Sequence, residues 1–258
     1  MLQSDASFIR DNLGIFCCPR CQGSLTLSGD TLGCSACQRG FAPVDDIPCL
    51  FWPNEWDPGK EDVTDRIKAF YEKNPFPDYD EYDSVGSLID KARKGLFAKL
   101  LDDQIPFGAR ILECGCGTGQ LSAFLSVASR TVVGADLCLN SLRLAHAFKR
   151  RNNLDNAHFL QMNLFRPCFK AGSFDLVISN GVLHHTSDPR LAFERITTLV
   201  KPGGYILVGL YHKYGRLATD LRRLIFNASG DRYKFLDRHA VDQRLSPAKR
   251  LAWFMDQY

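Results

Sequence analysis

Short apolar runs alternate with amphipathic helical patterns from residue 110 onward. The runs read RILECG, TVVGADL, HFLQMN, FDLVISN and YILVGLY, and they contain few polar residues. Strands of this kind are buried on both faces, and helices between them indicate parallel neighbours. The pattern predicts an α/β domain over residues 108–212 with a doubly wound, Rossmann-like sheet. In such sheets, ligands bind beyond the carboxyl ends of the strands.

The chain before this domain is patterned differently. Residues 52–60, WPNEWDPGK, combine proline, glycine and charge, which predicts a boundary. We therefore expect a small N-terminal module over residues 1–52 and a connecting segment over residues 53–107. Helical patterns cover residues 63–73 and about 88–101 of that segment.

Between these two helical patterns, the stretch FYEKNPFPDYDEYD concentrates aromatic residues and prolines. Such a segment is expected either as a strap that covers the core or as a lid over a ligand pocket. Tyr71 and Phe76 are the candidate lid residues.

Composition sets limits on size, partners and compartment. A chain of 258 residues buries roughly 70% of its unfolded surface, enough for one core and a small extra module. The formal net charge of +3, from 32 basic and 29 acidic residues, neither requires nor excludes a nucleic-acid partner. The N-terminus has no apolar run typical of a signal peptide, and no stretch nears the roughly 18 apolar residues of a membrane span. A cytoplasmic protein without membrane association is expected.

The 10 cysteines cluster near the N-terminus, where six precede Leu50. In a reducing compartment, clustered cysteines hold metal more often than they form disulfides. Two CxxC knuckles, CPRC and CSAC, lie a short hairpin apart, and paired thiolates at this spacing suit tetrahedral Zn(II). The expected ligands are Cys18, Cys21, Cys34 and Cys37. Iron would use the same four thiolates. Cys49 lies outside the pattern and is expected in a short strand as a small buried residue.

The motifs CPRCQGSL, CSACQRGF and PVDDIPCLF cover roughly residues 13–52. They resemble the zinc-ribbon family that includes the small activator subunit of tRNA and protein methyltransferases. The resemblance implies a structural role or contact with a protein partner, and no catalytic role.

A glycine-rich loop follows the first strand of the α/β domain, in ILECGCGTGQ. Gly115, Gly117 and Gly119 form GxGxG rather than the GxGxxG of a dinucleotide site. Glu113 just before them would repel a pyrophosphate but favours a cationic amino-acid ligand. The loop therefore favours S-adenosylmethionine over NAD, and its two cysteines act as small fillers.

Two further polar residues extend this pattern. Asp136 ends the next strand about 20 residues later, where a carboxylate accepts both ribose hydroxyls of a nucleoside. Asn163 closes the third strand, in position to reach an adenine edge. Together with the loop, they predict a cofactor site.

Residues 108–211 resemble the class I S-adenosylmethionine-dependent methyltransferases. The matching motifs are ILECGCGTGQ, VVGADL, FLQMNL, SFDLVISNGVLHHTSDP and LVKPGGYILVG. By this resemblance, the residues lining the methionine part, ribose, adenine and sulfonium are Glu113, Gly115, Gly117, Asp136, Asn163, Leu164 and Asn180. The family commonly has Asp where this chain has Asn163, whose amide oxygen still accepts a hydrogen bond.

His184 and His185 permit two interpretations. A histidine beside the methyl donor can deprotonate an acceptor oxygen or nitrogen. In related sequences, the HHTSDP stretch mostly shapes the loop and caps the next helix, whose start is marked by Ser187-Asp188-Pro189. Methyl transfer does not require a base, because aligning an activated donor with its nucleophile suffices.

The end of the chain departs from the class I pattern. That fold normally adds a helix and two antiparallel strands, whereas residues 213–258 contain the helical pattern GRLATDLRRLIFNA, a polar stretch and a helix start at Ser246-Pro247. We expect a truncated, helical C-terminal extension and no final pair of antiparallel strands.

These features predict a methyltransferase acting on an O, N or C atom, with a small-molecule acceptor favoured by the aromatic segment and the near-neutral charge. An RNA acceptor is the alternative, with phosphate contacts from Arg216, Arg222, Arg223 and Arg232. A non-catalytic binding module, in which the ribbon recruits a partner and the methyltransferase domain is a scaffold, is the second alternative.

Overall fold

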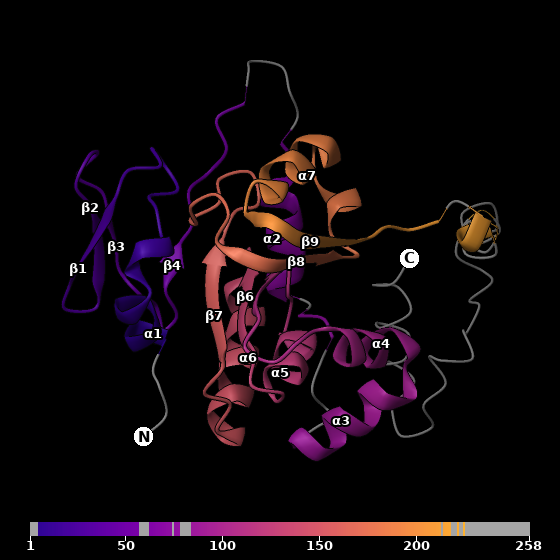
Figure 1. Ribbon diagram of the computed structural model, residues 1–258. Coiled ribbons are helices and arrows are strands. Elements are labelled where there is room, and N and C mark those ends of the chain that lie inside the picture. The colour runs from indigo at the N-terminus through magenta and orange to yellow at the C-terminus, as the bar shows by residue number, and fades with distance from the viewer. Residues whose placement is uncertain are drawn as a thin grey trace. The chain divides into compact units, whose positions relative to one another are not determined.

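The computed structural model describes residues 5–56, 62–73, 75–77, 84–212, 214–217, 221 and 224. The chain divides into two compact units, Met1–Leu210 and Tyr211–Tyr258. The first unit contains both predicted modules (Figure 1). Most of the C-terminal helical patterns lie outside the described residues, as do three of the four candidate RNA-binding arginines and the side chain of Arg216.

The N-terminal module begins with helix α1 (Asp5–Asp11) and a short 3-10 helix, η1 (Leu13–Ile15). An antiparallel sheet follows, made of β1 (Leu25–Ser28), β2 (Thr31–Cys34) and β3 (Gly40–Phe41). The β1–β2 hairpin turns at residues 29–30, where Gly29 takes a φ of 60° that favours glycine. This turn aligns the two strands so that both CxxC knuckles lie at the same end of the hairpin.

Within the described residues, the main sheet has six strands in the order β4-β7-β6-β5-β8-β9, and every pair is parallel. The strands are β4 (Cys49–Leu50), β5 (Arg110–Cys114), β6 (Thr131–Asp136), β7 (Ala157–Met162), β8 (Phe174–Asn180) and β9 (Val200–Gly209). The predicted doubly wound α/β fold is confirmed.

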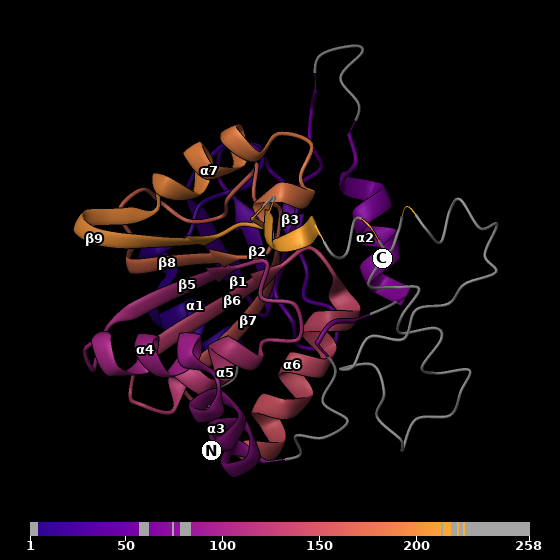
Figure 2. The ribbon, with the colours of Figure 1, turned by 90° about the vertical axis from the view of Figure 1, so that its right-hand side faces the viewer.

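Helices cover both faces of this sheet (Figure 2). They are α3 (Val85–Lys94), α4 (Leu96–Gln104), α5 (Gln120–Ser126), α6 (Leu139–Asn152) and α7 (Pro189–Thr197). Alternate strand residues enter two separate clusters: Ile111 packs with side chains of α3, α5 and α6, whereas Leu112 packs with α1, α7 and the ribbon sheet. The N-terminal module therefore shares one core with the α/β domain.

Strand β4 joins the two sequence modules directly. Cys49 pairs with Gln161 and Leu50 with Met162 of β7, and the Gln161 N–H donates to Pro48 O at 2.9 Å. The short strand predicted around Cys49 is thus present, but it is an edge strand of the main sheet. Cys49 is only partly buried, so the expectation of a buried residue was wrong.

The connecting segment differs from its prediction in one respect. Helix α2 (Thr64–Lys73) matches the helical pattern of residues 63–73. The single helix expected over residues 88–101 is instead two helices, α3 and α4, separated at Gly95. Gly95 has extended dihedral angles (φ −92°, ψ 124°) and serves as the C-cap of one helix and the N-cap of the next. No described helix is long and apolar enough to cross a membrane.

A buried charge cluster ties α1 to the α/β domain. The Asp5 carboxylate is paired with Lys149 of α6 and lies 3.2 Å from His146 and from His158. Burial alone would raise the pKa of Asp5. Hydrogen bonds with the two histidines and the Lys149 charge outweigh burial, and this pKa lies well below its ordinary value. Ionised Asp5 is therefore part of the native packing.

Replacing Asp5 tests this attachment. Asp5→Ala leaves the Lys149 ammonium buried without its carboxylate, and we expect the free energy of unfolding to fall by about 3–5 kcal/mol. Asp103→Ala, which removes an exposed pair with Lys99, is the matched control and should cost less than about 1 kcal/mol. Urea unfolding monitored by tryptophan fluorescence measures both. Equal losses would show that the buried cluster does not hold α1 in place.

Candidate functional site

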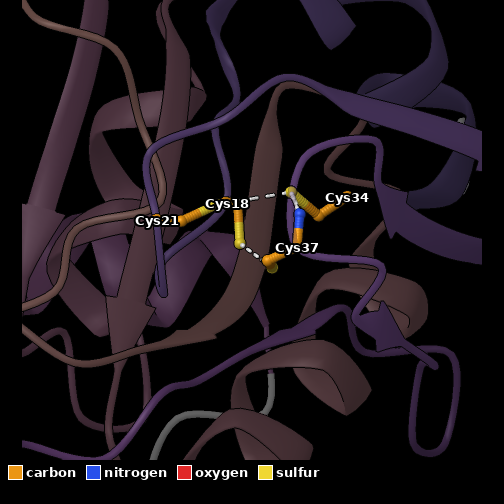
Figure 3. A group of neighbouring side chains, drawn as sticks. All are labelled: Cys18, Cys21, Cys34 and Cys37. Atoms are coloured by element: carbon orange, nitrogen blue, oxygen red, sulfur yellow. Dashed lines mark hydrogen bonds between the residues drawn. The ribbon is translucent and has the colours of Figure 1, made fainter.

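The four predicted metal ligands lie together beside the ribbon sheet. Cys18 and Cys21 precede β1, while Cys34 ends β2 and Cys37 lies in the turn after it (Figure 3). All four Sγ atoms lie within 4.8 Å of one another, with separations of 3.7 Å for Cys18–Cys37 and 3.5 Å for Cys21–Cys34. Tetrahedral Zn–S bonds of about 2.3 Å place sulfurs about 3.8 Å apart, so the cluster fits this metal.

The second site lies at the carboxyl end of β5. Gly115, Gly117 and Gly119 have φ values of 74°, 53° and 75°, which disfavour any side chain. A Cβ on Gly115 would lie 2.5 Å from Val182 Cγ2, and one on Gly119 would lie 2.4 Å from Phe159 Cε1. The loop is therefore both left-handed and tightly enclosed by neighbouring side chains, so these positions have no room for a Cβ.

Glu113 is buried on β5 just before this loop. Its Oε2 accepts a hydrogen bond of 2.5 Å from Ser122 Oγ of α5. Burial, with a smaller contribution from the nearby Asp136 charge, raises the pKa of Glu113 to about 7 against the opposing hydrogen bonds of Ser122. A cationic group bound at the loop would favour the ionised carboxylate. Sequence reasoning missed Ser122, because a serine inside an amphipathic helix carries no distinctive signal.

Asp136, at the end of β6, connects two loops. Its Oδ2 accepts from Gly117 N at 2.7 Å and its Oδ1 from Cys138 N at 2.8 Å. Burial raises the pKa of this carboxyl, and the backbone N–H groups partly offset the shift. Each carboxylate oxygen can accept more than one hydrogen bond, so both remain available to hydroxyl donors.

Asn163 is buried at the end of β7, with its amide already engaged. Nδ2 donates to Trp52 O at 2.9 Å and to Asn54 Oδ1 at 2.7 Å, while Oδ1 accepts from Phe165 N at 3.0 Å. This side chain anchors the connecting segment to the sheet. An adenine amino group would have to share the amide oxygen with Phe165 N, and the partly buried Leu164 lies next to it. The predicted adenine contact stays a prediction.

The remaining candidates follow β8. Asn180 is exposed. A Cβ added to Gly209 would lie 1.8 Å from Asn180 Oδ1, so only glycine fits at position 209. His184 and His185 belong to the 3-10 helix η2 (Leu183–His185), with ring centroids 4.2 Å apart. The Asp188 side chain accepts from Leu191 N at 2.9 Å, which confirms the predicted helix cap.

Part of the aromatic segment reaches the glycine loop. A Cβ on Gly117 would lie 2.4 Å from Phe76 O, and Thr118 Oγ1 donates to Pro77 O. The predicted lid residue Phe76 is thus beside the loop through its backbone, while its side chain is half exposed. Strands β7, β6, β5 and β8 are consecutive parallel neighbours, so the predicted residues at their carboxyl ends share one edge of the sheet.

Comparison with known proteins agrees with this arrangement. Residues 112–208 match the methyltransferase domain family. A ubiquinone biosynthesis O-methyltransferase of Ralstonia nicotianae is 33% identical over 41% of this chain and 44% of its own length. An uncharacterized methyltransferase of Mycobacterium bovis is 35% identical over 42% of this chain and 54% of its own length. The chain spans about half the length of these curated relatives.

Among solved structures, a TehB-like SAM-dependent methyltransferase from Corynebacterium glutamicum is 23% identical, with a TM-score of 0.40. The alignment covers 55% of this chain and 81% of that one. The matched residues 112–208 run from β5 to β9 of the parallel sheet.

The raised pKa of Glu113 predicts a pH-dependent stability. The folded state holds this proton up to a pH of about 7, whereas an unfolded glutamate releases it near 4.5, so the contribution of Glu113 to stability falls as pH rises between these values. Glu113→Gln should remove this fall and gain at most about 3 kcal/mol relative to the parent between pH 4.5 and 8. Urea unfolding across that range measures it, with Glu194→Gln as the exposed control. A parallel pH profile for parent and variant would contradict the shift.

Proposed function

We propose that this protein is an S-adenosylmethionine-dependent methyltransferase that methylates an O, N or C atom of a small molecule. The observation that carries the proposal is the link between Asp136 and the glycine loop. One carboxylate bonds Gly117 N after β5 and Cys138 N after β6, so an acceptor of hydroxyl groups lies directly beside a glycine loop that has no room for side chains.

In this proposal, each candidate residue has a defined task. Glu113 favours the ammonium of the methionine part, and the backbone at Gly115, Gly117 and Gly119 lets that part approach. Asp136 accepts from the ribose hydroxyls, Asn163 and Leu164 border the adenine, and Asn180 borders the sulfonium. The cofactor supplies an activated methyl group. The chain therefore needs to align an acceptor with it and to exclude water.

His184 or His185 is proposed as a base only for acceptors that must lose a proton. The capping role of Asp188 accounts for the Asp188-Pro189 part of the motif without any catalytic function. Rate measurements with an acceptor of known pKa would separate these two roles.

The acceptor class follows from two observations. The contact of residues 75–77 with the glycine loop supports a site enclosed on that side. The Ralstonia relative is named for O-methylation in ubiquinone biosynthesis, which is small-molecule chemistry. An RNA acceptor would be favoured by substrate binding that weakens strongly with salt. A scaffold without activity would be favoured by failure to bind cofactor at all.

We propose Zn(II) as the resident metal of the four-cysteine cluster, with a structural role. The ribbon sheet packs into the same cluster as Leu112 and Val133 of the main sheet, and β4 extends that sheet at β7. The ribbon resembles an activator of methyltransferases, and here it packs against the methyltransferase domain of its own chain. Its proposed partner is therefore this domain rather than a separate protein.

Cofactor binding is tested by calorimetric titration with S-adenosylhomocysteine. We expect micromolar affinity for the parent and at least about a hundredfold loss for Asp136→Ala, because a buried carboxylate that accepts two hydroxyl groups is worth about 3 kcal/mol or more. Asp103→Ala is the control and should bind like the parent. Absence of binding by the folded parent would contradict the proposed function.

The metal is tested by elemental analysis. We expect about one zinc per chain in the parent, little in Cys34→Ser, and a lower midpoint of thermal unfolding in that variant because metal binding and ribbon folding are coupled. Cys49→Ser, next to the ribbon but outside the ligand set, should retain the metal. One iron per chain would exclude zinc, and a metal-free parent of unchanged stability would exclude a structural metal.

A further inference from the structure

Helix α6 begins without a capping side chain from its own segment. Its N-cap is Cys138, whose side chain makes no capping hydrogen bond in the described structure. Cysteine is not among the residues that favour this position. The first N–H groups of a helix nevertheless need acceptors, especially beside a buried site.

Glu72 of α2 supplies those acceptors from 67 residues away in sequence. Its carboxylate oxygens accept from Leu139 N at 2.8 Å and from Asn140 N at 2.9 Å. The Asn140 Nδ2 donates in turn to the Glu72 backbone carbonyl at 2.6 Å. An anion at this end of a helix also interacts favourably with the helix dipole. Helix α2 thus caps α6 from outside.

This cap lies next to the proposed ribose acceptor. Asp136 precedes the helix and bonds Cys138 N and Gly117 N, so two carboxylates share the successive N–H groups of residues 138–140. Glu72 occupies the amides of Leu139 and Asn140, while Asp136 bonds the Cys138 amide and the Gly117 amide of the glycine loop. At this end of α6, the Glu72 carboxylate thus caps the helix, and the Asp136 carboxylate also contacts the glycine loop.

Other contacts hold the same segment against both loops. Cys138 Sγ donates to Lys68 O at 3.4 Å on α2, and Thr118 Oγ1 donates to Pro77 O. All residues of α2 are described and none of them is fully buried. Polar contacts at the loops, rather than burial in the core, therefore hold α2 in place, and Glu72 makes three of them.

We propose that Glu72 is a positioning residue for cofactor binding: it caps α6 and thereby holds Asp136 toward the glycine loop, ready for the ribose. The proposal rests on the proposed function. Glu72 does not touch the cofactor. It acts through Asp136, and helix α2 holds Glu72 in position.

The pH dependence of cofactor affinity distinguishes a positioning role of Glu72 from a purely structural one. The charged or titratable groups around Asp136 are Glu113 of β5, the Glu72 carboxylate and Lys68 ammonium of α2, and the thiols of Cys116 and Cys138. After burial, the Glu72 charge is among the causes that raise the pKa of Asp136. Removing that charge lowers this pKa, so Asp136 stays ionised and binds to a lower pH. The contribution of Glu113 to the pH profile should be the same in the parent and in the Glu72 variants.

The experiment is calorimetric titration with S-adenosylhomocysteine from pH 5 to 8, on the full chain. Glu72→Ala removes both acceptors and the charge, and we expect affinity at pH 7.5 to fall about tenfold. Glu72→Gln keeps one oxygen acceptor of similar size, so we expect a loss of only about threefold and an acidic limb of the profile shifted to lower pH. Asp65→Asn, an exposed change on the same helix, is the control and should match the parent.

Each outcome decides one point. A folded parent that fails to bind contradicts the proposed function itself. A parent that binds, with both Glu72 variants equal to it, overturns the role of Glu72 alone. Weaker binding by Glu72→Gln without a shift of the acidic limb assigns Glu72 mere structural support and also overturns the positioning role. If Glu72→Ala does not fold, the profile of Glu72→Gln decides.

Discussion

The site depends on the hydrogen bonds that Asp136 makes across the β5–β6 pair. Parallel pairing brings the ends of the two strands side by side, and the carboxylate then binds one N–H from each following loop. Gly117, which has a φ of 53°, donates its amide to this carboxylate. Burial disfavours the charge, and the backbone donors stabilise it. Strain and desolvation are thus concentrated at the point where a charged, hydroxyl-bearing ligand would offset them.

The ribbon and the α/β domain are one structural unit because neither covers its own apolar surface. A small sheet with short strands buries little by itself, and metal ligation is the usual compensation. In this protein the ribbon module also buries Phe16, Leu25 and Leu32 in the cluster that contains Leu112 of the main sheet. The Asp5 cluster and β4 add a buried ion pair and two backbone pairings to the same interface. Loss of the ribbon would therefore expose one face of the α/β domain.

The connecting segment is more than a link between these parts. Asn54, through Asn163, reaches the end of β7, and Glu72 reaches the start of α6. The described pieces of this segment thus contact the loops after three consecutive strands.

The sequence by itself determined the class of fold, the grouping of the four CxxC cysteines and the positions of the polar residues at the strand ends. These signals are local. Apolar runs, CxxC spacing and a glycine pattern involve residues that are neighbours in the sequence, so they can be recognised without a structure. Only the tertiary structure decided that β4 joins the main sheet, that Gly95 divides one expected helix into two, and that Asn163 holds residues 52–54. It alone also brought Glu72 and Ser122 to the site. Such contacts join residues far apart in the chain or on one helix face, and a carboxylate or hydroxyl has no local pattern that reveals its distant partner.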